Sequence, residues 1–178
     1  MMQVYIPVTL AMLRQLVAGG SLWPVNGTAF AVTPALRESY AEGDDDELAE
    51  VALQEAALAS LRLLATEADA ADAFDDADGL PPRRAVLAAE VDLAESGANY
   101  RPDLDDAVVR LDGPVAMDQV IAAYVDNADA EPAVTAAIAV IDAADLGDED
   151  ADLVVGDAQD HDLAWYASQE LPFLLDLL

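Results

Sequence analysis

The stretch VYIPVTLAMLRQLVAGG, residues 4–20, decides the fold class, because a short apolar strand passes directly into an amphipathic helix within it. Pro7 is expected to close the strand, since proline cannot donate to a sheet ladder. Thr9 stands where a helix N-cap is expected, and the leucines that follow fall on one helical face. The pair Gly19-Gly20 ends the helix. Such a strand–helix unit is typical of domains in which helices pack on a sheet.

Hydrophobic patterning predicts further strands and helices along the chain. Strands are expected at residues 28–33, 85–91, 107–111 and 120–125, and helices at 34–40, 44–67, 129–144 and 148–158. This order implies an α+β fold, with a mixed β-sheet of about five or six strands and helices packed on it; a ferredoxin-like arrangement is one option. The chain 1–178 is expected to be a single domain. The leucines of helix 44–67 surround most of its circumference, so we expect this helix to be covered on more than one side.

Three segments lack a regular pattern of this kind. Residues 68–82 form an acidic Ala/Asp run that we interpret as a loop, and residues 163–167 could be a strand or a helical turn. The tail 171–178 is apolar at seven of its eight positions, so we expect it to be covered. We rank docking on the chain's own helix 44–67 first, contact with a second subunit next, and a foreign partner last.

The net charge of -29 limits the classes of partner. All seven basic residues are arginine, and binding to nucleic acid or to an anionic membrane needs clustered positive charge. We therefore expect no nucleic acid and no membrane among the partners, whereas basic proteins fit. The simplest interpretation of the charge is that it keeps an alanine-rich surface soluble.

The composition also argues against several cofactors and against secretion or membrane insertion. The chain has no cysteine, which excludes disulfides and thiolate sites, and it has no glycine-rich phosphate-binding loop. No leader opens it and no apolar run approaches a membrane span, so we expect a cytoplasmic protein without a cofactor.

Two acidic clusters invite a calcium interpretation, and both fail at decisive positions of an EF-hand loop. In the cluster before Gly79, Phe74 and Ala85 occupy the first and last ligand positions. The acids of residues 148–152 have the required spacing, but Leu153 stands where glycine is needed. We therefore predict no metal site and interpret these acids as solvated loop residues or helix caps.

The single histidine, His161, is the main candidate for catalysis. A pocket formed with Trp165, Tyr166 and Glu170 could use His161 as a general base, with Tyr166 and Glu170 as further catalytic candidates. The flanking acids would favour the imidazolium form, which cannot accept a proton, so a structural or capping role is the competing interpretation. No nucleophile elbow supports a serine hydrolase.

The arginines Arg83, Arg84 and Arg101 are islands of positive charge. We interpret them as partners of nearby acids on a solvated face, with a small anion site as the alternative.

Three segments, VYIPVTL (4–10), GTAFAVTPALRE (27–38) and HDLAWY (161–166), resemble a family of small acidic proteins of unknown function common in actinobacteria. The resemblance covers most of the chain outside the acidic run after residue 68. It implies a bacterial cytosolic protein, and it implies no activity or site residue.

We therefore expect a non-catalytic protein-interaction domain, with a homodimer as one option. The first alternative is a small enzyme or ligand-binding protein that uses the pocket near His161. The second is an acidic mimic of nucleic acid that occupies the groove of a basic protein.

Overall fold

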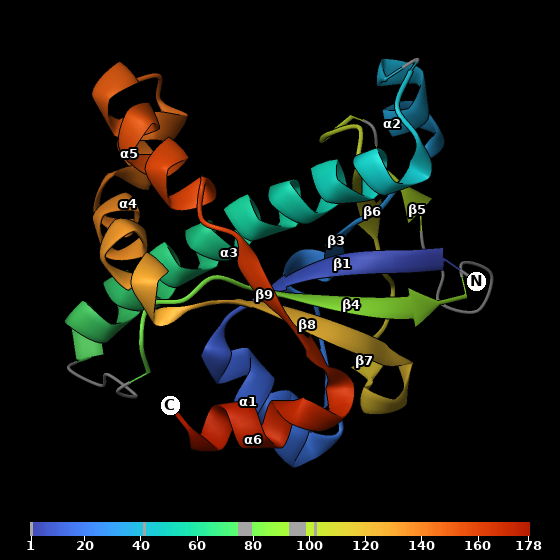
Figure 1. Cartoon of the computed structure of the whole chain (residues 1–178), viewed down its shortest axis with the longest axis horizontal. Coiled ribbons are helices and arrows are strands. Elements are labelled where there is room, and N and C mark those ends of the chain that lie inside the picture. Colours follow the sequence, from blue (N-terminus) through green and yellow to red (C-terminus); the bar gives the residue numbers. More distant parts are fainter. Residues whose placement is uncertain (1, 41, 75–79, 93–98, 102) are drawn as a thin grey trace.

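The computed structural model describes residues 2–40, 42–74, 80–92, 99–101 and 103–178, with side chains of residues 70–74 left aside. Its centre is a seven-stranded sheet in the order β5-β6-β3-β1-β4-β8-β9 (Figure 1). The strands are β1 (Met2–Val8), β3 (Thr28–Phe30), β4 (Ala85–Val91), β5 (Asn99–Tyr100), β6 (Val108–Arg110), β8 (Val120–Asp126) and β9 (Leu163–Ala167). A second small sheet pairs β2 (Ser21–Leu22) with β7 (Val115–Ala116).

The fold is α+β, as predicted, but the sheet differs from the expected one. Each pair of neighbouring strands in the described residues is antiparallel, so the sheet is not mixed, and it has seven strands rather than five or six. The ferredoxin-like option is also wrong, because the observed order of seven strands does not follow that four-stranded pattern. The segment 163–167, left undecided above, is strand β9.

The first strand and helix follow the prediction closely. Helix α1 (Leu10–Gly19) is capped by the Thr9 hydroxyl, which accepts a hydrogen bond from the Met12 amide, and it ends at Gly20 in the left-handed region. The strand does not stop at Pro7. It continues to Val8, because β3 meets β1 only at Tyr5, opposite Phe30, and beyond that point β4 alone pairs with β1.

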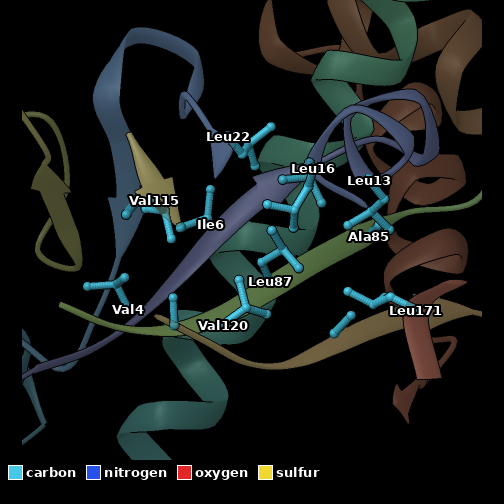
Figure 2. Packing of buried hydrophobic residues seen from close by; sticks show 14 of the residues in the cluster. Val4, Ile6, Leu13, Leu16, Leu22, Ala85, Leu87, Val115, Val120 and Leu171 are labelled. Atoms are coloured by element: carbon cyan, nitrogen blue, oxygen red, sulfur yellow. The ribbon is translucent and has the colours of Figure 1, made fainter. Parts of the chain in front are cut away.

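One face of the sheet is covered by α1 and by α6 (Leu171–Asp176). Figure 2 shows the core between them, where Ile6 and Leu87 of the sheet meet Leu13 and Leu16 of α1, with Leu171 nearby. Leu171, Leu174 and Leu175 of the apolar tail are therefore covered by their own chain, as ranked first, whereas Phe173 and Leu177 remain exposed. Their cover is α1 and the sheet rather than the predicted long helix, because α6 lies on the opposite face from α3.

The other face carries α2 (Pro34–Ser39) and the long helix α3 (Asp45–Phe74), which crosses the strands (Figure 1). The C-terminal half of α3 packs against α4 (Glu131–Asp145) and α5 (Glu149–Gln159). This confirms that α3 is covered on more than one side. The prediction of a loop at residues 68–82 is wrong in its first part, because the alanine-rich residues 68–74 continue helix α3. Residues 75–79 lie outside the described part of the chain.

Single 3-10 turns complete the chain at Val25–Gly27, Met117–Gln119, Ala128–Ala130 and Ser168–Glu170. None of the described helices combines the length and the hydrophobicity that a membrane crossing requires.

Candidate functional site

The polar centre of the molecule is an ion pair between Arg84 and Asp126 on the α3 side of the sheet. Both side chains are completely buried. The Arg84 Nε and Nη2 atoms donate to the two oxygens of Asp126 at 2.9 and 2.7 Å, and the Arg84 amide donates to Asp126 Oδ2 at 2.8 Å. A bidentate pair of this geometry, with further hydrogen bonds, satisfies charges that would otherwise be costly to bury.

The remaining donors of Arg84 hold the end of α5 and the start of β9. Arg84 Nη1 donates to Gln159 Oε1, and Nη2 donates to the His161 carbonyl oxygen, both at 2.8 Å. Gln159 in turn donates to the Gln54 carbonyl of α3 at 3.1 Å. Arg84 therefore fixes where α5 ends and where β9 enters the sheet.

The adjacent residues Arg83 and Arg84 form different kinds of ion pair, partly exposed for Arg83 and completely buried for Arg84. Arg83 pairs with Glu131 at 3.3 Å, and Arg101 pairs with Asp103 at 2.8 Å, which agrees with pairing to nearby acids. The prediction of a solvated face is wrong for Arg84, because Asp126 on the neighbouring antiparallel strand reaches it inside the protein. Asp126 was missed by the sequence argument. An acid directly after one apolar strand and a base directly before another are the signal that could have found the pair.

His161 lies half-buried between α5 and β9. Its carbonyl accepts from Arg84, and its amide donates to the Ala158 carbonyl at 3.2 Å. The contacts that position His161 are therefore made by its backbone.

The predicted pocket of His161, Trp165, Tyr166 and Glu170 is not assembled. Trp165 and Tyr166 are successive residues of β9, so their side chains point to opposite faces of the sheet. Tyr166 packs on the core under α1 and α6. Glu170 accepts from the Ala167 amide at 3.1 Å and caps the turn after β9.

Trp165 instead joins two tyrosines on the α3 side, and we call Tyr5, Tyr124 and Trp165 the open aromatic face. Trp165 lies directly opposite Tyr124 in the β8–β9 register, and the Tyr5 and Tyr124 ring centroids are 6.4 Å apart. Trp165 is 57% exposed, whereas Tyr5 is buried, so α3 leaves only the β9 end of this face uncovered.

The surroundings of the open aromatic face are negatively charged. Burial raises the pKa of the Tyr5 hydroxyl above its ordinary value, and Tyr124, Asp46 and Glu50 raise it further. Burial also raises the pKa of Tyr124, with Glu50 as the second cause. Both acids lie in the first turns of α3 and are exposed.

The outer edge of β9 presents backbone groups that point away from the neighbouring strand β8. The Ala167 amide bonds to Glu170 rather than to β8, and the Asp126 amide bonds to Arg84 on the β4 side. Since backbone groups alternate along an antiparallel strand, Leu163, Trp165 and Ala167 all direct their amides away from β8. In the described sheet β9 has a partner on one side only.

The acidic clusters show no metal-ligating arrangement in the described residues. Asp148 caps α5 by accepting from the Ala151 amide at 3.0 Å, which is one of the roles expected for these acids. The cluster before Gly79 lies mostly outside the described part of the chain. Elsewhere in that part, no three acidic or histidine side chains are close enough to share an ion.

These features define an antiparallel α+β domain with a buried arginine–carboxylate centre and one open, aromatic sheet edge. The chain belongs to a family of unknown function, DUF6912, whose model matches residues 2–175. No curated protein and no solved structure matches it.

Proposed function

We propose that this protein is a non-catalytic interaction domain that binds an extended, basic segment of a partner protein along the outer edge of β9. The observation that carries the proposal is the outward direction of the Leu163 and Trp165 amides, next to the Ala167 amide that Glu170 already engages. An extended segment that adds to such an edge gains main-chain hydrogen bonds, and its side chains then contact both faces beside it.

The charge of the chain supports a basic occupant. The net charge is -29, and Asp160, Asp162 and Glu170 flank the strand itself. A second copy of the chain would bring the same acids to the edge, so like-charge repulsion disfavours the homodimer. A basic segment meets complementary charge at every one of these positions.

The non-catalytic part of the proposal rests on the separation of the candidate catalytic groups. Tyr166 faces the α1 core, Glu170 caps a turn, and His161 is positioned through its backbone. A firmly placed β9 suits binding, because an ordered edge loses little entropy when a segment docks.

The test is amide chemical-shift mapping of the labelled protein with two peptides. One peptide alternates arginine and valine, and the matched peptide has glutamate in place of arginine. We expect the basic peptide alone to shift the amides of β9. Leu163→Pro should abolish the shifts because it removes an outward amide, whereas Leu163→Ala, which keeps that amide, should not. Shifts confined to another surface, or a self-associated dimer by light scattering in the absence of peptide, would contradict the proposal.

A further inference from the structure

The side chains of a segment docked on β9 would alternate between the two faces of the sheet. Those on the α3 side would lie next to Trp165, because side chains directly across neighbouring strands have Cβ atoms about 5 Å apart. Trp165 would then be flanked by Tyr124 on one side and by the docked residue on the other.

The alternation of backbone directions along β8 and β9 also places the Trp165 and Tyr124 side chains next to each other. The two residues direct their backbone groups away from each other, so they form a non-hydrogen-bonded pair, in which side chains approach more closely than in the alternative pair. Tyr5 adds a third ring at 6.4 Å from Tyr124. Tyr5 is buried and Tyr124 is partly buried, so the exposed ring of Trp165 supplies the accessible aromatic face, and such a face carries negative electrostatic potential.

Acidic side chains add negative charge near the two tyrosines. Asp46 and Glu50 of α3 help to raise the pKa of Tyr5, and Glu50 also helps to raise the pKa of Tyr124. In the described structure, five arginines pair with acids other than Asp46 and Glu50, Arg110 donates to the Asn26 carbonyl, and Arg14 lies on α1 at the other face of the sheet. The face therefore combines stacking surface and negative charge without an internal cation.

We propose that the open aromatic face is a specificity site for an arginine side chain of the docked segment, whose guanidinium stacks on Trp165 and is attracted by the acids that flank β9. This inference rests on the proposed function. Arginine fits better than lysine, because its planar guanidinium stacks on aromatic rings and is more weakly hydrated.

The experiment uses Trp23→Phe, which leaves Trp165 as the only tryptophan and so as the reporter of binding by fluorescence. The arginine–valine peptide is compared with a peptide that carries citrulline, an uncharged analogue of the same shape, at the arginine positions. We expect citrulline to weaken binding by about three- to thirtyfold. In the Trp23→Phe variant, the further substitution Tyr124→Phe keeps an aromatic ring and should retain the preference for arginine over citrulline. Trp165→Leu, followed by amide shifts of β9, should lose it.

The outcomes separate the two proposals. Shifts of the β9 amides with both peptides at equal affinity would overturn the arginine site and leave docking on β9 in place. Equal arginine preference in Trp165→Leu would also overturn the site, because the preference would then come from the overall charge. The absence of β9 shifts with every peptide would overturn the proposed function itself.

Discussion

Arg84, directly before β4, and Asp126, the last residue of the neighbouring strand β8, form a bidentate ion pair in which neither side chain reaches solvent. Arg84 also carries the hydrogen bonds that place Gln159 and the start of β9. The pair thus links the centre of the sheet to the edge that we propose as the binding surface.

Replacing one partner of this pair should be strongly destabilising. Arg84→Met leaves the Asp126 carboxylate buried without its counter-ion, and we expect the free energy of unfolding to fall by about 3–5 kcal/mol. Urea denaturation measures this. Arg62→Met is the matched control, because the Arg62–Asp145 pair is half-exposed and contributes about 1 kcal/mol or less. The double variant Arg84→Met/Asp126→Leu should recover part of the loss; equal costs for Arg84→Met and Arg62→Met would contradict the prediction.

Glu55 should make the stability depend on pH in an unusual direction. Burial first, and then Asp105, raise the pKa of Glu55 above its ordinary value of 4.5, against a smaller opposing effect of Arg62. Because the folded-state pKa lies above the unfolded one, ionisation costs stability as the pH rises through this interval. Glu55→Gln should therefore raise the melting temperature at pH 7, by less than about 1 kcal/mol in stability. The gain should vanish below the ordinary pKa, and an equal gain in acid would show that the charge is not its cause.

The docking of α6 can be tested with two leucines of the same helix end. Leu171 is fully buried in the core with α1, whereas Leu177 is 84% exposed. Leu171→Ala should cost about 2–5 kcal/mol, and Leu177→Ala should have almost no effect. Deletion of residues 171–178 should lower the melting temperature and leave a monomer by light scattering. A change of mass on deletion would instead point to a contact between subunits.

Gly27 should tolerate alanine less well than Gly20. Both have positive φ angles, of 69° and 82°, which cost an L-residue about 1–2 kcal/mol. A Cβ atom on Gly27 would also lie 2.4 Å from the Leu111 carbonyl oxygen, whereas the space around Gly20 is open. We therefore expect Gly27→Ala to lower the free energy of unfolding by about 1–3 kcal/mol more than Gly20→Ala does, measured by thermal unfolding. Similar costs would mean that the strand near Leu111 can move aside.

Local elements were predictable where short-range chemistry decides them. The Thr9 cap, the left-handed end of α1 and the start of α2 at Pro34 all depend on neighbouring residues alone. The leucines around α3 correctly indicated cover on two sides, because each buried side needs its own apolar stripe.

Long-range pairing could not be predicted in the same way. Periodicity shows that residues 85–91 form a strand, but it does not say that this strand lies between β1 and β8. The two-residue strands β2, β5 and β7 are too short to show any period. Arg84 seemed solvated because only the pairing of β4 with β8 brings Asp126 to it, and the candidate face of Trp165 depends on the same pairing through Tyr124.

Helix α3 supplies side chains to two separate cores, one against the sheet and one against α4 and α5. Neither layer can detach without stripping one flank of this helix. Slow hydrogen exchange should consequently reach the same protection in β4 and in α4, at the free energy of whole-molecule unfolding. No part of the described structure would then unfold separately, and a destabilising substitution in α4 would lower the protection of the sheet amides by the same free energy.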